Sequence, residues 1–193
     1  MDQDARFLET IHPEPHPLLR ELVRHARRDE VEVAGREIAR LLSTLVAAMQ
    51  ASRILEVGTG YGYATLWMAF AQPRMGKIWT IDPDTRRTDV ALSYFRRAGE
   101  DDYIEVLNTP AAELLENFPH RNLDIVFVDA DPAEYRTCLD LAVPMLKLSG
   151  LVIANGCLSE RAADFDRYFV GRSDLDATIL PLGTGTAIGA RTR

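Results

Sequence analysis

Three features of this sequence predict an α/β fold with one mostly parallel, seven-stranded sheet. Five short apolar runs alternate with segments of helical spacing between residues 53 and 154. Such alternation builds a parallel sheet with helices on both faces. Two further strand-like runs near the C-terminus flank a glycine turn, which predicts an antiparallel hairpin. Apolar helical faces within residues 1–50 predict a helical extension of a single domain that spans residues 1–193.

The N-terminal extension starts with a proline-rich arm, His12–Pro17, in which each residue before a proline is pushed out of the helical region. A first helix is expected after the arm, with an apolar face made by Leu18, Leu19, Leu22, Val23 and Ala26. A second helix is expected from about Val33 to Met49, because apolar residues recur there at spacings of three and four.

The rest of the chain supplies the sheet and its covering helices. The parallel strands are expected at Arg53–Val57, Lys77–Ile81, Ile104–Leu107, Leu123–Val128 and Gly150–Ala154. The helices between and after them are expected near Gly62–Ala71, Thr85–Arg97, Ala111–Asn117, Ala133–Leu146 and Arg161–Val170. The closing hairpin is expected from strands at Ala177–Leu182 and Thr186–Arg191, around Gly183-Thr184-Gly185.

The charge and the amino-acid composition limit the kinds of partner that the protein is expected to bind. The 193 residues carry a net charge of −7, with 47% hydrophobic and 26% charged residues, as in a globular protein. This charge argues against broad attraction to nucleic acid or to an anionic membrane surface. Two interpretations remain for Arg20, Arg24, Arg27 and Arg28. They can form a local basic patch, or, more simply, they lie on a solvated helix face.

Cysteine usage and the N-terminal sequence predict a cytoplasmic protein. Cys138 and Cys157 are too few and too isolated for a disulfide framework or a zinc site. The N-terminus, Met1 to Asp4, is acidic where a signal peptide is basic. No apolar run approaches the roughly 18 residues that a membrane span needs, so no membrane partner is expected.

The most informative segment is Ile54–Gly62, in which an apolar run ends in Glu56 and opens into three alternating glycines before a helical stretch. Strand, tight glycine loop and helix bring the backbone close to a nucleotide-like ligand. A pyrophosphate over this loop would meet the like charge of Glu56. A ligand with a cationic amino-acid part, such as S-adenosylmethionine (SAM), would be attracted. The spacing G-x-G-x-G also weakens the dinucleotide interpretation, so a nicotinamide dehydrogenase ranks last.

Carboxylates at two further strand ends extend the candidate site, because ligands of open α/β sheets bind beyond the carboxyl ends of the strands. Asp82 ends one strand at the distance from the glycine loop that suits a ribose-binding carboxylate. Its alternative role is a helix cap in Asp82-Pro83-Asp84, and both roles can coexist. Asp129 follows a fully apolar strand, with loop capping as its alternative.

Together, the segments Ile54–Ala69, Thr80–Asp84, Ile125–Tyr135 and Gly150–Leu158 resemble the cation-dependent O-methyltransferases, the group of the caffeoyl-CoA and catechol O-methyltransferases and their small bacterial relatives. The resemblance runs from about Val33 to the C-terminus. It implies a Rossmann-like methyltransferase fold with extra N-terminal helices, SAM as methyl donor with S-adenosylhomocysteine (SAH) as product, and a homodimer.

The resemblance also implies roles for single residues. Glu56, Gly58, Thr59 and Gly60 would surround the methionine part of the donor, and Asp82 would hold its ribose. Pro83 and Ala111 would border the adenine, and Val33 would contact the donor from the N-terminal side. Asp129 would lie near the sulfonium, as a cofactor-binding and catalytic residue.

The chain departs from the family where the family holds its metal and its acceptor. In the family, Mg²⁺ is held by an aspartate at the position of Asp129 and by an Asp-Asn pair. That pair is Asn155-Gly156 in this chain. Mg²⁺ binds mainly through carboxylates and water. A divalent metal is therefore not expected. The family lysine near the acceptor hydroxyl is replaced by Pro132, and the long acceptor loop after Leu158 is largely missing.

The sequence thus predicts a SAM-dependent methyltransferase that acts on the hydroxyl group of a small molecule without the family's metal. The proton of that hydroxyl would go to another base, with Asp131, Glu134, His12 and His16 as open candidates. Two alternatives remain: a protein that binds SAM or SAH without catalysis, and a tRNA-modifying relative, which the acidic balance disfavours.

Overall fold

The structure is a computed structural model that describes residues 7, 10–12, 16–162 and 164–193. Its strands form one sheet in the order β3-β2-β1-β4-β5-β7-β6. The first five strands are parallel, and β7 pairs antiparallel with both β5 and β6. The strands span β1 Arg53–Val57, β2 Lys77–Ile81, β3 Ile104–Leu107, β4 Leu123–Val128, β5 Leu146–Asn155, β6 Leu175–Leu180 and β7 Thr186–Arg191.

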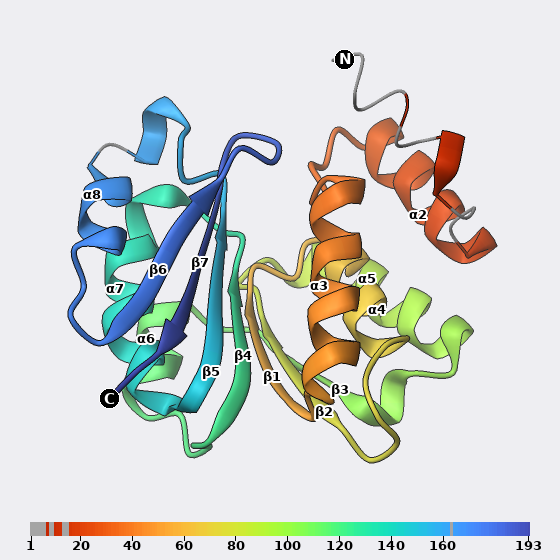
Figure 1. Cartoon of the computed structure of the whole chain (residues 1–193). Coiled ribbons are helices and arrows are strands. Elements are labelled where there is room, and N and C mark those ends of the chain that lie inside the picture. The colour runs from red at the N-terminus through yellow and green to blue at the C-terminus, as the bar shows by residue number, and fades with distance from the viewer. Residues whose placement is uncertain (1–6, 8–9, 13–15, 163) are drawn as a thin grey trace.

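Helices cover both faces of this sheet (Figure 1). One face carries α2 Pro17–Arg28, α3 Arg36–Met49, α4 Tyr63–Ala69 and α5 Thr85–Ala98. The opposite face carries α6 Ala111–Glu116, α7 Tyr135–Ala142 and α8 Phe165–Val170. The result is the three-layer arrangement that the alternating sequence predicts.

The two faces of the sheet have separate apolar cores because successive side chains of a strand point to opposite faces. In β1, Ile54 packs with the α2–α5 layer, whereas Leu55 and Val57 pack with the α6–α8 layer. Such strands are buried on both faces, which explains why the sequence shows them as continuous apolar runs. Cys138 and Cys157 are both buried and unpaired.

The predicted fold class is confirmed, and the first four parallel strands have the predicted bounds. The second helix begins at Arg36 and not at Val33, because Gly35 is its N-cap and residues 31–35 have no regular secondary structure. The helix expected over Ala133–Leu146 is a 3₁₀ turn, then α7, then a second 3₁₀ turn that contains Pro144. Likewise, α8 begins at Phe165, after a 3₁₀ turn at Glu160–Ala162.

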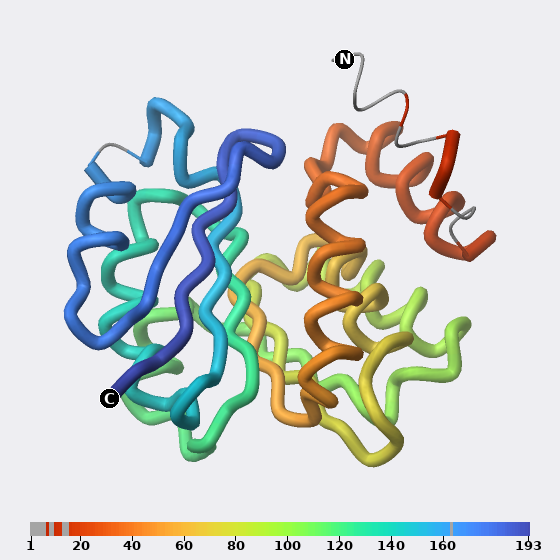
Figure 2. Tube along the Cα trace, in the orientation of Figure 1, coloured from red at the N-terminus to blue at the C-terminus, as the bar shows by residue number. Residues whose placement is uncertain are grey.

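Segments from both ends of the sequence reach the same edge of the sheet (Figure 2). The loop between α2 and α3 and the turn between β6 and β7 both lie above the carboxyl end of β1. Among the described residues, no helix combines the length and the apolarity that crossing a bilayer requires.

Candidate active site

A pocket of about 1110 Å³ lies at the carboxyl ends of β1, β2 and β4. From β1 the chain adds β2 and β3 on one side and then β4 and β5 on the other, so the strand order reverses between β1 and β4. Ligands of open α/β sheets bind at such a switch point. Eight of the nine predicted cofactor-binding residues line this pocket: Val33, Gly58, Thr59, Gly60, Asp82, Pro83, Ala111 and Asp129.

The glycine loop after β1 forms the floor of the pocket, and its shape requires glycine at two positions. Gly58 has φ +99°, and a Cβ atom there would lie 2.1 Å from the carbonyl oxygen of Asp129. Gly62 has φ +83°, and a Cβ atom would lie 2.4 Å from the ring of Phe95. The loop therefore packs directly against the end of β4, and it leaves backbone groups facing the pocket.

The buried carboxylate of Asp82 supports the glycine loop. Its Oδ2 accepts a hydrogen bond from the Gly60 N–H at 2.9 Å, and its Oδ1 accepts one from the Asp84 N–H at 2.9 Å. Asp82 thus fixes the turn before α5, while Asp84 caps that helix. Each carboxylate oxygen has a second lone pair, so the capping role leaves acceptor capacity for a ligand in the pocket.

Glu56 lies beneath the glycine loop and not in the pocket lining. Its side chain is fully buried, and one of its oxygens, Oε2, accepts hydrogen bonds from Thr65 and, at 2.6 Å, from Thr80. The Thr80 hydroxyl is also bonded to that of Thr59, 2.7 Å away. Burial raises the pKa of Glu56 to about 8, although the threonine bonds act in the opposite direction. Its link to the pocket is therefore indirect, through Thr80 and Thr59.

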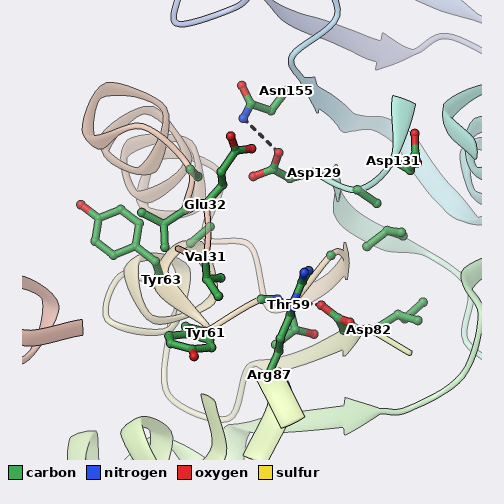
Figure 3. A pocket seen from close by; sticks show the side chains of 18 of the residues that line it. Val31, Glu32, Thr59, Tyr61, Tyr63, Asp82, Arg87, Asp129, Asp131 and Asn155 are labelled. Carbon is green, nitrogen blue, oxygen red and sulfur yellow. Dashed lines mark hydrogen bonds between the residues drawn. The ribbon is translucent and has the colours of Figure 1, made fainter. Parts of the chain in front are cut away.

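Asp129 and Asn155 lie together above the glycine loop, and Glu32 faces them (Figure 3). The Nδ2 of Asn155 donates a hydrogen bond of 3.0 Å to Oδ1 of Asp129. Burial raises the pKa of Asp129, the Asn155 bond opposes this, and the charge of Glu32 adds to it.

The residues at the place of the family's metal ligands offer a divalent cation fewer anionic oxygens than an Asp-Asn pair would. Asn155 donates an N–H to one oxygen of Asp129, its own amide oxygen is buried without a hydrogen-bond partner among the described residues, and Gly156 has no side chain to offer. In the part of the chain that the structure describes, no three His, Cys, Asp or Glu side chains converge as a metal site. Hard cations such as Mg²⁺ need an oxygen shell.

The four candidate bases differ in whether they line the pocket. Asp131 and Glu134 line the pocket, but Asp131 is held by Arg161 at 2.9 Å and by the N–H of Ala133. His16 is the N-cap of α2, where its Nδ1 accepts from the N–H of Leu18. Neither His16 nor His12 is among the described residues that line the pocket.

A chain of hydrogen bonds ties the N-terminal helices to the glycine loop. Tyr61, between two glycines of the loop, donates to Oδ2 of Asp29 at 2.9 Å. Asp29 also contacts Nε2 of His25 at 3.1 Å, and the other ring nitrogen of His25 lies 3.0 Å from the Tyr94 hydroxyl. The N-terminal extension therefore supports the floor of the pocket from outside.

Sequence reasoning missed several pocket residues. Glu32 and Val31 come from the loop before α3, Arg87 from α5, and Thr184 from the hairpin turn. A signal for Glu32 existed in the alternating segment Val31–Ala34, which was assigned in part to the helix. No local pattern marks Thr184, because only the antiparallel pairing of β7 with β5 brings it to this edge.

Comparisons with known proteins agree with this geometry. A family model described as O-methyltransferase matches residues 9–164. The chain is 30% identical over 155 residues to a caffeoyl-CoA O-methyltransferase of Populus kitakamiensis, which covers 76% of this chain and 66% of that protein. It is 29% identical over 119 residues to a catechol O-methyltransferase of Mycobacterium tuberculosis, which covers 62% of this chain and 54% of that protein.

Among solved structures, the O-methyltransferase TomG of Streptomyces achromogenes, involved in tomaymycin synthesis and solved in complex with SAM, superposes with a TM-score of 0.87. The two chains share 23% sequence identity and cover each other completely, so this likeness shows a common fold. The chain spans less than two thirds of the length of the two curated relatives.

Proposed function

The chain belongs to the O-methyltransferase family, and we propose that it transfers a methyl group from SAM to the hydroxyl group of a small molecule without a divalent metal. The observation that carries this proposal is one pocket that joins the glycine loop, Asp82 and Asp129. Its volume of about 1110 Å³ exceeds the upper end of the range of roughly 300–1,000 Å³ for a single small-molecule site. A donor and a small acceptor can therefore lie in it together.

The donor would lie along the edge of the sheet. Asp82 would accept hydrogen bonds from its ribose, and Pro83 and Ala111 at the ends of neighbouring elements would border its adenine. Gly58, Thr59, Gly60, Val33 and Asp129 would surround the methionine part. The SAM complex of the Streptomyces O-methyltransferase, which shares the fold, supports SAM as the ligand.

Methyl transfer is an in-line displacement in which positioning supplies most of the catalysis. The acceptor oxygen forms a bond to the methyl carbon while the carbon–sulfur bond breaks, and its electron pair stays on sulfur. The acceptor proton must leave to a base, and Glu134 and Asp131 are the predicted candidates that line the pocket. Because an amide and a glycine stand where the family has its Asp-Asn pair, the proposed reaction contains no metal step.

Calorimetry with SAM and SAH, followed by turnover assays, tests this function. We expect both ligands to bind, and we expect methylation of a member of a panel of phenols, catechols and hydroxy acids at equal rate with and without chelator. Donor binding with no turnover across the panel would favour the non-catalytic alternative. Activity that is lost in chelator and restored by Mg²⁺ would contradict metal independence.

A further inference from the structure

Two carboxylates face each other in the pocket, and they come from distant parts of the sequence (Figure 3). Glu32 lies in the loop between α2 and α3, and Asp129 follows β4. Both side chains line the same pocket, and Figure 3 shows them on the same side of it, next to Asn155. Asn155 bonds only one oxygen of Asp129, so its second oxygen remains available on the pocket side.

Among the described residues, no ion pair brings a cation to these two carboxylates. The arginines among the described pocket residues are Arg87 and Arg161, and each is engaged elsewhere. Arg87 lies 3.5 Å from a carboxylate oxygen of Asp84, and Arg161 bonds Asp131. Two like charges that face each other in a partly buried site attract a cationic ligand.

The ligand that brings a cation to this place is the methyl donor, so the inference rests on the proposed function. The sulfur of SAM is bonded to the 5′ carbon of its ribose, and the glycine loop joins Asp82 to Asp129, because the Gly60 N–H bonds Asp82 and Gly58 packs against the backbone of Asp129. A neutral acceptor hydroxyl offers no positive charge, and the N–H of Asn155 disfavours a metal ion.

We propose that Glu32 and Asp129 recognise the positive charge of the donor sulfonium, so that the pocket binds SAM more tightly than SAH. The two ligands share their adenosine and their amino-acid group, and they differ in the methyl group and in the charge on sulfur. Glu32 is then a specificity-determining residue that distinguishes donor from product by charge.

This recognition would ease the exchange of product for donor after each reaction. When the acceptor oxygen takes the methyl group, the electron pair of the broken carbon–sulfur bond neutralises the sulfur. The ligand loses one positive charge, and the reaction leaves the side chains of Glu32 and Asp129 unchanged. SAH is therefore held less strongly than the donor that it replaces, which favours its exchange for new SAM.

Calorimetric titration of SAM and SAH into the full-length protein and the Glu32→Gln variant tests the proposal. We expect the unmodified protein to prefer SAM, and the variant to lose about tenfold in SAM affinity with little change for SAH. Glu32→Asp should keep most of the preference because it keeps the charge. Glu37→Gln removes the same charge from α3, outside the described pocket lining, and should change neither affinity.

Each other outcome overturns the proposal. Equal affinity of the unmodified protein for SAM and SAH would show that the pocket does not recognise the positive charge on sulfur. An equal loss for both ligands in Glu32→Gln would assign Glu32 to a group that they share. Mg²⁺ binding that disappears in Glu32→Gln would make the pair a metal site. If neither SAM nor SAH binds the unmodified protein, the proposed function itself fails; melting curves of the variants show that they are folded.

Discussion

At the scale of single residues, burial determines which acidic side chain supports the fold and which one lines the pocket. Glu56 is the fourth of the five residues of β1, whereas Asp82 follows the last residue of β2, so Asp82 lies further toward the carboxyl end of the sheet. Glu56 points under the glycine loop and is fully buried, whereas Asp82 reaches the pocket. The sequence places acidic residues at the right strand ends, and only the packing of α4 against β1 separates a structural carboxyl group from one that lines the pocket.

The raised pKa of Glu56 predicts a pH-dependent stability. The native state holds this proton up to about pH 8, whereas an ordinary Glu loses it near 4.5. Between these values the native state binds more protons than the unfolded state, so the free energy of unfolding falls as pH rises. Glu56→Gln removes this loss, which is on the order of 4 kcal/mol across that window. Urea denaturation of the unliganded protein from pH 5 to 8 measures it; parallel pH profiles for both proteins would contradict the assignment.

Asp82→Asn tests the ribose assignment. The amide keeps the shape of the carboxylate and loses its charge and one acceptor, so SAM affinity should fall by about 2 kcal/mol, roughly 30-fold. Asp84→Asn is the matched control, because Asp84 caps α5 and is not among the described residues that line the pocket. Calorimetry that finds both variants equally close to the parent would reject the ribose role.

At the scale of elements, the strands follow from the sequence more closely than the helices. Buried parallel strands are continuous apolar runs with clear ends, and β1 to β4 have the predicted bounds. The start of β5 was missed, because Lys147, Leu148 and Ser149 break the apolar run. Helix ends depend on details that periodicity does not carry, such as the N-cap at Gly35 and the turn at Pro144.

The contact between the glycine loop and β4 makes Gly58 the least replaceable residue of the loop. Gly58→Ala would place a Cβ atom 2.1 Å from a backbone oxygen at φ +99°, and backbone cannot yield as a flexible side chain does. We expect a loss of about 3 kcal/mol or more in the free energy of unfolding. Gly99→Ala is the control: it has φ +71° but nothing within 4 Å of the added atom, so about 1 kcal/mol is expected. Equal losses in urea denaturation would refute the steric explanation.

At the scale of the whole molecule, the sequence predicts the part of the pocket made by the strand ends better than the part made by the N-terminal extension and the β6–β7 turn. The glycine loop, Asp82 and Asp129 follow strands in a known order, so a sequence pattern locates them. Glu32 and Thr184 reach the pocket through the docking of the N-terminal extension and through the hairpin, and these long-range contacts leave no local pattern. The recognition of the family is confirmed, because its model matches residues 9–164.

Assembly as a homodimer stays a prediction that the resemblance motivates. Part of the apolar face of α3 that suggested it, including Ile38, Leu42 and Val46, is buried within the chain itself. Leu41 and Leu45 remain partly exposed on that helix. Light scattering at micromolar concentration should give twice the chain mass of 21.6 kDa. A particle with the mass of a single chain would refute the dimer.

Restoring the family's metal ligands should create a metal site that the unmodified protein lacks. The double variant Asn155→Asp, Gly156→Asn supplies a second carboxylate and an amide oxygen beside Asp129. Gly156 has φ +75°, which asparagine tolerates better than most residues, and the nearest side-chain atoms lie 3.5 Å or more from an added Cβ atom. Calorimetry with Mg²⁺ should show binding only in the double variant, and Gly156→Asn alone serves as the control. Mg²⁺ binding by the unmodified protein would contradict metal independence.

The walls of the pocket emerge from the ribosome at different times. Synthesis runs from the N-terminus, so Glu32, the glycine loop, Asp82 and Asp129 are all made before Gly183 and Thr184 complete the lining. A nascent chain that ends at β5 already contains every predicted donor-binding residue, but it lacks the antiparallel strand that covers the edge of β5. Its unpaired edge can join another chain. The β6–β7 hairpin therefore covers the edge of β5 and makes β6 the edge strand, in addition to bringing Gly183 and Thr184 to the pocket.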